Sequence, residues 1–224
     1  MDKGLDVNGL LTRIADLFFP PHCVHCGRGG TWFCSGCANE LDLFSDAQHT
    51  RFAPSQLDQV YSLCWHSGAA RSAALALKYE GLRVLGQPLG NMMYDYWCPL
   101  GISVDVIVPI ALHKSRKRSR GYNQAALLAR QIAHRADLAM EEGCLVRQRQ
   151  TVSQVGLGRQ ERWQNVRDAF VCVKHLDGFG ILLVDDVLTT GATMEAAASA
   201  LRAAGAEKVY GLTLTRATRM DQKI

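Results

Sequence analysis

Two adjacent carboxylates followed by a run of small hydroxylated residues carry the clearest chemical signal in this chain. Asp185 and Asp186 follow an apolar run, residues 181–184, whose pattern is typical of a short strand buried on both faces. After a small-residue turn, residues 194–204 are rich in alanine and favour a helix, and Gly205 suits the left-handed position beyond its end. The sequence therefore predicts a strand, an acidic pair at its carboxyl end, a tight turn and a helix. The turn consists of Thr189, Thr190, Gly191, Ala192 and Thr193.

This order of elements fits a sugar phosphate. A turn that enters a helix can bind an anion, because backbone amides and the helix dipole point toward it. Gly191 has no Cβ and would let a phosphate approach the backbone. The two carboxylates would repel a phosphate, but they suit sugar hydroxyls or Mg²⁺. Together these preferences predict a ribose 5-phosphate site.

Other interpretations of the same stretch remain open. An ordinary strand-to-helix connection capped by a threonine would have a similar sequence. An Asp-Asp pair after a strand also occurs in Walker B strands and phosphoacceptor pockets, but those sites lack a small turn that runs straight into a helix. A Walker A loop requires Gly-Lys-Ser/Thr, and this tripeptide does not occur in the chain.

Four of the eight cysteines have the spacing of a metal site. They follow the pattern C-x2-C-x7-C-x2-C and predict a closed shell of four thiolates around a structural zinc ion. The surrounding residues 20–43 are too few to fold around a core of their own, whereas a structural zinc contributes roughly 10–16 kcal/mol of apparent binding energy. Disulfides and an iron–sulfur cluster are the alternatives. The predicted ligands are Cys23, Cys26, Cys34 and Cys37.

The other four cysteines are isolated in the sequence, and we expect them to be buried or half-buried small hydrophobic residues. They are Cys64, Cys98, Cys144 and Cys172.

Composition and charge exclude few classes of protein. The chain has 224 residues, 48% of them hydrophobic, and a net charge of +4, which alone is too small to argue for nucleic acid. No run reaches 18 apolar residues and the N-terminus lacks a signal-peptide pattern, so a cytoplasmic protein is expected. Residues 1–19 predict an amphipathic helix that docks on the protein, with a membrane surface as the alternative.

Positive charge is concentrated in two segments. The first, residues 113–124, follows a predicted strand at 104–108 and is expected to be a loop. One helix terminus contributes at most ~2 kcal/mol toward an anion, whereas micromolar affinity requires about 8 kcal/mol. A phosphate-directed role is therefore predicted for this segment, with a solvated loop as the alternative. Its cations are Lys114, Arg116, Lys117, Arg118 and Arg120. The second segment is predicted to be a polar arm across the mouth of the site, with Arg147, Arg149, Arg159, Arg162 and Arg167.

The remaining elements follow from hydrophobic pattern and composition. Strands are predicted at 60–65 and 208–214, and helices at 68–79, 82–97 and 124–135, with a polar linker at 42–54.

With these parts in view, the stretch from 180 to 205 resembles the fingerprint of the phosphoribosyltransferase fold. The whole chain resembles the ComF/GntX family of phosphoribosyltransferase-like proteins, which is associated with competence for DNA uptake. One departure is that many relatives carry a second pair of CxxC knuckles, and none follows Cys37 here, so the ribbon is halved. The resemblance rests on FFPPHCVHCG, FCSGC, LKYEG at 77–81, VPIALHKSRKRSRGYNQAALLA at 108–129, RQRQTVSQVGLGRQERWQNVRDAF at 147–170 and LLVDDVLTTGAT at 182–193.

The resemblance implies an α/β fold, a type I phosphoribosyltransferase-like, Rossmann-type parallel sheet with a small N-terminal zinc-ribbon module. The expected divisions are a helix at 1–19, the ribbon at 20–43 and the phosphoribosyltransferase-like domain at 60–216. It also implies that Asp185 and Asp186 hold the ribose hydroxyls of phosphoribosyl pyrophosphate, accompanied by Mg²⁺, while the turn from Thr189 to Thr193 holds the 5-phosphate. The pyrophosphate side, or DNA phosphates, would contact Lys114, Arg116, Lys117, Arg118, Arg120, Arg149 and Arg162.

Three functions remain open, and no catalytic residue is assigned. The favoured one is a competence protein that handles incoming single-stranded DNA and retains a phosphoribosyl pyrophosphate pocket, with Tyr122, Trp163 and Phe170 as candidate aromatic partners for bases. The alternative is an active phosphoribosyltransferase that acts on a nucleobase or amine, although no base-binding element is recognisable. The third is a scaffold whose zinc ribbon docks a DNA-processing protein.

Overall fold

The structure is a computed structural model and describes residues 20–44, 56–149 and 168–217. Several predictions fall on other residues: the helix at 1–19, most of the linker, and four residues of the basic arm. Those four are Arg159, Arg162, Trp163 and Arg167. Their predicted roles stay predictions.

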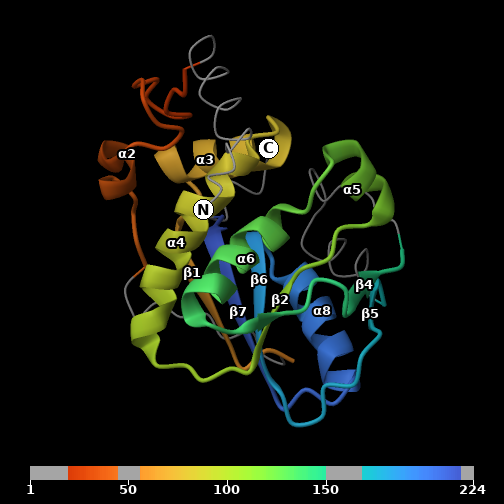
Figure 1. The fold of residues 1–224 in the computed structure, drawn as a ribbon. Helices are drawn as coiled ribbons and strands as arrows, with labels where there is room; N and C mark the ends of the chain where they lie inside the picture. The colour runs from red at the N-terminus through yellow and green to blue at the C-terminus, as the bar shows by residue number, and fades with distance from the viewer. Residues whose placement is uncertain (1–19, 45–55, 150–167, 218–224) are drawn as a thin grey trace, which may run out of the picture.

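A five-stranded parallel sheet forms the centre of the molecule, with the strand order β1-β7-β6-β2-β3 (Figure 1). The predicted parallel α/β class is confirmed. Strand β1, near the start of the described body, lies beside β7 at its end, with Gln59 opposite Tyr210. The strands are β1 (Gln59–Trp65), β2 (Val106–Pro109), β3 (Ala139–Met140), β6 (Gly180–Leu188) and β7 (Lys208–Arg216).

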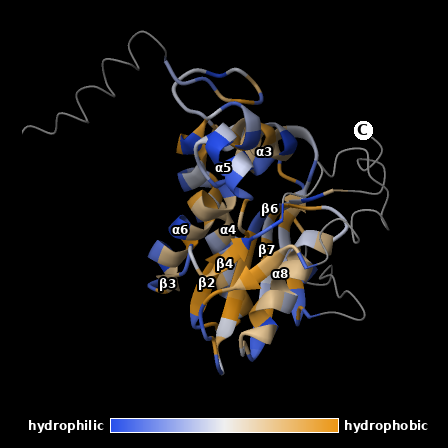
Figure 2. Ribbon diagram, turned by 90° about the vertical axis from the view of Figure 1, so that its right-hand side faces the viewer, coloured by the Kyte–Doolittle hydropathy of each residue, from blue (hydrophilic) through white to orange (hydrophobic). Residues whose placement is uncertain are grey.

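Helices cover both faces of this sheet. Figures 1 and 2 show α4 and α6 on one face and α8 on the other. The 3₁₀ helices η2 (Arg83–Leu85) and η3 (Cys98–Leu100) flank α4. The longer helices are α3 (Gly68–Tyr79), α4 (Gly86–Trp97), α6 (Gln124–Ala136) and α8 (Ala192–Ala203), and the shorter ones are α2 (Ser35–Asn39) and α5 (Lys114–Arg120).

Strand β6 shows how the sheet contributes to a hydrophobic core on each of its faces. Leu182 and Val184 pack into the core on the side of α3, α4 and α6, whereas Ile181 and Leu183 pack into the core on the side of α8. All four side chains are fully buried. A parallel strand covered on both faces reads as a continuous apolar run, which is the pattern that predicted it.

Two boundaries near the acidic pair differ from the predictions. Strand β6 continues through both aspartates to Leu188, because β7 extends to Arg216 and pairs with it there. Helix α8 begins at Ala192, two residues earlier than predicted, with Gly191 as its N-cap in the left-handed region at φ 81°. Gly205 has the predicted positive φ, 100°. The acidic pair therefore lies inside the C-terminal part of strand β6 and not beyond its end.

The first basic segment was predicted to be a loop, and this was wrong. Residues 114–120 form helix α5, because Lys, Arg and Ser all tolerate helical geometry. His113 caps its start by accepting from the amide of Ser115, and Gly121 ends it in the left-handed region at φ 78°. At the same end of the sheet lie the C-terminus of α3 and the start of α8 (Figure 1).

A small antiparallel hairpin was not predicted. Strand β4 (Leu145–Arg147) pairs with β5 (Phe170–Cys172), so that Arg147 lies opposite Phe170. The amide of Gln148 also donates to the carbonyl of Ala169 at 2.9 Å. This pairing holds the two ends of the predicted basic arm together. No helix in the described part of the chain is both long and apolar enough to cross a membrane.

Candidate functional site

The Asp186 carboxylate lies buried at the end of β6, with a hydrogen-bond donor at Oδ1 and, at Oδ2, an ion-pair partner but no hydrogen bond from the described residues. Lys78 Nζ, from the last turn of α3, lies 3.3 Å from Asp186 Oδ2. Gln124 Nε2, from the first residue of α6, donates to Asp186 Oδ1 at 3.3 Å. Only 2% of Asp186 is exposed, so these two partners compensate a charge that water does not reach.

The contacts continue from Gln124 back to α3. The Arg120 guanidinium donates to Gln124 Oε1 and lies over the ring of Tyr79, 5.5 Å from its centroid. Since Lys78 and Tyr79 are neighbours in the chain, these contacts close a ring of side chains from α3, α5, α6 and β6. We call it the polar ring, and its members are Lys78, Tyr79, Arg120, Gln124 and Asp186.

Two sequence segments quoted for the family resemblance meet here. Tyr122 Oη donates to the carbonyl of Leu77 at 2.5 Å, and Arg83 donates to the carbonyl of Gly121 at 3.2 Å. The Arg83 guanidinium also covers the Tyr122 ring, 4.8 Å from its centroid. LKYEG and RGYNQ are therefore one structural unit that holds the polar ring in place. The sequence offered the two segments but no signal that they touch.

Electrostatics separate the two aspartates. Burial alone would raise the pKa of Asp186, but Lys78 and Gln124 hold it below its ordinary value. Burial and the neighbouring Asp186 charge raise the pKa of Asp185 well above its ordinary value. Asp186 in turn raises the pKa of Lys78. Asp186 is therefore the more readily ionised of the two, and a cation added beside Asp185 would offset the burial and the like charge that raise its pKa.

Asp185 shares one cation with Asp186, since the Lys78 charge acts to lower the pKa of both carboxyls. Its Oδ1 accepts from the Asp186 amide at 2.9 Å, and the side chain is only half-buried. Arg147, on β4, is buried, and burial together with the Arg116 charge lowers its pKa to about 10, against the attraction of Asp185. Asp185 and Arg147 are therefore close enough for their charges to interact.

The turn from Thr189 to Thr193 follows directly. Thr190 is buried, Thr189 and Thr193 are half-buried, and the Ala192 amide donates weakly to Thr190 Oγ1 at 3.4 Å. Gly191 has a positive φ, a conformation that residues with a Cβ rarely adopt. The turn therefore sits at the N-terminus of a twelve-residue helix, the arrangement expected of an anion site.

The predicted cations have different environments. Lys117 pairs with Glu142 at 3.3 Å. Arg120 belongs to the polar ring, and Arg116 is half-buried near Arg147. Three others are exposed, namely Lys114, Arg118 and Arg149. Arg162 lies outside the described residues.

The candidate aromatic residues are not available for stacking as expected. Tyr122 is 7% exposed and Phe170 8% exposed, because both pack into the core beneath the arginines that cover them. Trp163 lies outside the described residues. Tyr79, which was not among the predicted aromatic partners for bases, is 65% exposed. The sequence feature that could have identified it is its place in LKYEG, immediately after the lysine that pairs with Asp186.

The four cysteines of the predicted metal site lie together. Their sulfur atoms are all within 4.8 Å of one another. Cys23 Sγ lies 3.7 Å from Cys37 Sγ, and Cys26 Sγ lies 3.6 Å from Cys34 Sγ. A tetrahedron with Zn–S bonds of about 2.3 Å has sulfur–sulfur edges of roughly 3.8 Å. The arrangement fits a metal ion such as zinc, with all four thiols unbridged.

Backbone amides prepare this cluster for a cation. Burial would raise the pKa of the Cys23 thiol, but the backbone amides of Cys26, Cys34 and His25 lower it to about 6. The Cys37 amide donates to Cys34 Sγ at 3.5 Å, which lowers the pKa of Cys34. Such amides favour thiolate, the form that a metal binds.

The isolated cysteines follow the prediction except at one position. Cys64 and Cys144 are buried, and Cys172 is half-buried. Cys98 is exposed, so the prediction was wrong there, because η3 places it at the surface beyond the end of α4.

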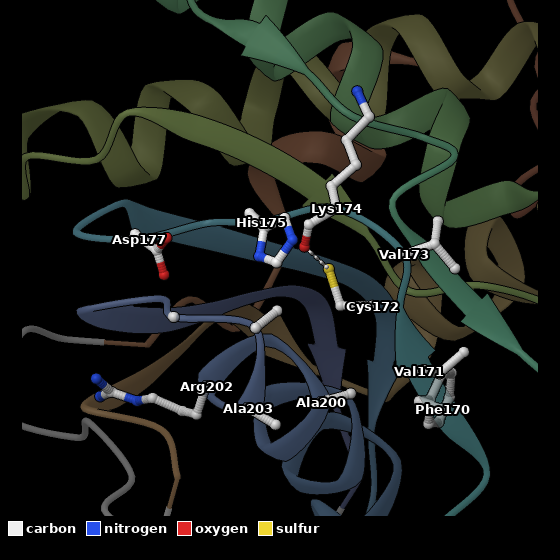
Figure 3. Close-up of a pocket in the computed structure, with 12 residues that line it drawn as sticks. Phe170, Val171, Cys172, Val173, Lys174, His175, Asp177, Ala200, Arg202 and Ala203 are labelled. Carbon is white, nitrogen blue, oxygen red and sulfur yellow. Dashed lines mark hydrogen bonds between the residues drawn. The ribbon is translucent and has the colours of Figure 1, made fainter.

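A separate cavity of about 580 Å³ lies between β5 and the C-terminal end of α8 (Figure 3). It is remote from the acidic pair, since α8 begins beside that pair and ends at the cavity. Its cations Lys174 and Arg202 pair with Glu141 and Asp58, at 2.6 Å each, and the Lys174 side chain extends away from the other labelled residues. The cavity is therefore a poor phosphate site.

Comparison with known proteins identifies the fold family. The phosphoribosyl transferase domain matches residues 100–219, the part of the chain that contains β6, its acidic pair and α8. The chain belongs to this family. The domain's match begins after β1 and α3, yet β1 pairs with β7 in the same sheet, and α3 supplies Lys78 to the site.

The chain is also similar to a competence protein and to DNA utilization proteins. It is 28% identical to competence protein F of Haemophilus influenzae, over 89% of this chain and 99% of that protein. It is 35% identical to DNA utilization protein YhgH of Salmonella typhi, over 50% of this chain and 49% of that protein. The resemblance inferred from the sequence is confirmed.

Among solved structures, the chain is similar to a purine phosphoribosyltransferase from Pyrococcus horikoshii Ot3. The two share 14% identity with a TM-score of 0.38, over 61% of this chain and 83% of that one.

Proposed function

We propose that this protein is a ComF-like competence protein that handles incoming single-stranded DNA in the cytoplasm and binds phosphoribosyl pyrophosphate at the β6–α8 end of its sheet. The observation that carries the proposal is the polar ring. It holds Asp186 from helices α3 and α6, with Arg120 of α5 supporting Gln124, beside a helix N-terminus, a glycine turn and a second carboxylate.

In this proposal the ligand's parts divide among these groups. The 5-phosphate binds the turn from Thr189 to Thr193, where amides and hydroxyls face the start of α8. Asp185 accepts from the ribose hydroxyls, because Asp186 is already engaged by Lys78 and Gln124. The sequence predicted that both carboxylates contact the ribose. We now propose that Asp185 contacts the ribose hydroxyls, whereas Asp186 positions the site through Lys78 and Gln124.

The pyrophosphate needs counter-charge beyond the turn. The charge of Arg147 interacts with that of Asp185 and with that of Arg116, and Arg118 is exposed on α5. Asp185 would hold Mg²⁺, which would supply charge neutralisation there. An added cation would lower the raised pKa of Asp185.

The DNA-handling part of the proposal rests on charge and on relatives. Helix α5 carries its cations on a seven-residue surface helix, where they can follow the phosphates of a strand. The similar proteins are named for competence and for DNA utilization. The four-cysteine cluster would hold a structural zinc, and docking of a DNA-processing protein on this ribbon stays a prediction.

Isothermal titration calorimetry with phosphoribosyl pyrophosphate and Mg²⁺ tests the pocket. The wild-type protein should bind about one ligand per chain, and Asp185→Asn should bind at least tenfold more weakly. Asp137→Asn is the matched control, because Asp137 is exposed at the end of α6 and its left-handed conformation suits asparagine. Absence of binding by folded wild-type protein would reject the pocket.

An active phosphoribosyltransferase is the second candidate, favoured by the family match itself. Such an enzyme would release pyrophosphate when a nucleobase or amine attacks the ribose C1, with cations stabilising the leaving group. A coupled pyrophosphate assay over a panel of acceptors separates the two. Binding without turnover supports the DNA-handling protein, and turnover that Asp185→Asn abolishes supports the enzyme.

A further inference from the structure

Tyr79 is an exposed aromatic residue at the edge of the candidate site. Its exposed fraction, 65%, is the highest among the exposed large hydrophobic residues that the structure describes. It is the last residue of α3, next to Lys78, which binds Asp186. The position of the ring is therefore tied to the position of the buried acid.

The surroundings of this ring are cationic. The Arg120 guanidinium lies over it at 5.5 Å, and that guanidinium is itself held by Gln124. Because Gln124 already holds this guanidinium, little of its freedom would be lost when a ligand binds, so the ring and its arginine are preorganised.

A ring in such a field suits a ligand that combines a flat π surface with negative charge. An apolar protein partner would meet charged neighbours around a single ring, whereas a nucleotide would stack on the ring and pair its phosphate with arginine. The alternative interpretation is that Tyr79 has a structural role alone: it ends α3 and packs against Arg120. The two interpretations predict different behaviour when the ligand's base is removed.

We propose that Tyr79, with the Arg120 guanidinium over its ring, is a stacking platform for a nucleobase beside the phosphoribosyl pocket. The inference rests on the proposed function and deepens it by naming where the base lies. The base would come from a single strand whose phosphates follow α5, or from a free nucleotide. The chemistry recognised is the same in both cases: a π face joined to a phosphate.

The test compares two labelled oligonucleotides of equal length by fluorescence anisotropy, one of deoxythymidines and one with an abasic backbone. Stacking contributes roughly 1–3 kcal/mol per base, equivalent to about 5- to 150-fold in affinity. Wild-type protein should therefore prefer the base-bearing strand by at least about fivefold. Tyr79→Ala should remove this preference, and Tyr79→Phe should retain it.

Phe179→Ala is the matched control, since Phe179 is an exposed aromatic, 41% exposed, that directly precedes the start of β6, far from its acidic end. Circular dichroism verifies that each variant is folded. A second arm titrates adenosine monophosphate by calorimetry into wild-type protein and Tyr79→Ala. Loss of binding in this arm alone identifies a free nucleotide as the source of the base.

The outcomes separate this inference from the proposed function. Equal binding of both oligonucleotides by the wild type, with strong salt dependence, keeps the DNA-handling function. No binding to either oligonucleotide rejects DNA handling, and the nucleotide arm then decides the platform alone. The platform is overturned if Tyr79→Ala changes neither the preference for the base-bearing strand nor the binding of adenosine monophosphate.

Discussion

The four-cysteine cluster and the polar ring are both compact groups of polar side chains, but they are built in opposite ways. The outermost cysteines are 14 residues apart, and all four ligands lie in one short segment. The polar ring joins Gln124 to Asp186, 62 residues away, and draws on three helices and a strand. One site is made by local spacing, and the other is made by the topology of the sheet.

The two sites also depend on different sources of stability. The cysteine segment has few buried side chains of its own, such as Phe33, so a bound metal would supply much of its order. The polar ring lies at the end of a sheet whose two faces are buried in hydrophobic cores. Its ion pair and hydrogen bonds add to the stability that these cores provide. Removing a ligand should therefore disorder the first site and leave the framework of the second intact.

The largest expected effect comes from removing the metal. Chelation, or Cys23→Ser, should lower the metal content from about one zinc per chain and increase amide exchange across residues 22–38. Because a structural zinc contributes roughly 10–16 kcal/mol, protection there should fall to near zero, while β6 and β7 stay protected. Hydrogen exchange with mass spectrometry measures both. Cys98→Ser, an exposed cysteine outside the cluster, is the control, and a protected segment without metal would contradict the comparison.

Breaking the polar ring should have a smaller, global effect. Lys78→Met leaves the buried Asp186 charge without its ion-pair partner, which costs about 3–5 kcal/mol for a fully buried pair. Because the Lys78 side chain is 28% exposed, we expect about 3 kcal/mol or less. Thermal unfolding measures the loss, with exposed Lys114→Met as control. Adding Asp186→Asn should recover part of it, and a double variant no more stable than Lys78→Met would show that the pair is not the cause.

The pH dependence should distinguish the two aspartates. The folded state raises the pKa of Asp185, so ionising it costs stability as the pH rises from about 4 through that raised pKa. Asp185→Asn should therefore be more stable than wild type at neutral pH, with the difference vanishing below pH ~4. The pKa of Asp186 is lowered, so Asp186 has the opposite sign: its stabilisation is present above its unfolded pKa and is lost as the pH falls through its lower, folded pKa. Denaturant unfolding across this range measures both, and an Asp185→Asn variant less stable at pH 7 would contradict the assignment.

The smallest effect on stability should come from α5. The Lys117–Glu142 pair is exposed, and such pairs contribute about 0–1 kcal/mol. Alanine at Arg116, Lys117 and Arg118 should barely change the melting temperature. The same change should lower the salt slope of single-stranded DNA binding by about 0.7 for each lost phosphate contact. An unchanged slope would show that α5 does not contact the DNA phosphates.

The contrast between the sites explains what the sequence could predict. The cysteine cluster was predictable because its ligands are near neighbours. The acidic pair and Gly191 were predictable because a strand, turn and helix follow one another directly. The partners of Asp186 were not, because Lys78 reaches it only when α3 crosses the strand ends. Likewise, the burial of Tyr122 and the exposure of Tyr79 depend on how two distant segments pack, which no local pattern records.

A crystal structure with phosphoribosyl pyrophosphate and Mg²⁺ would show whether this ligand binds at the end of β6. We expect the 5-phosphate against the amides of residues 190–193, the ribose hydroxyls on Asp185, and the Lys78–Asp186 pair intact. A ligand bound elsewhere, such as in the cavity at the C-terminal end of α8, or a structure in which Asp185 turns away from it, would contradict the account.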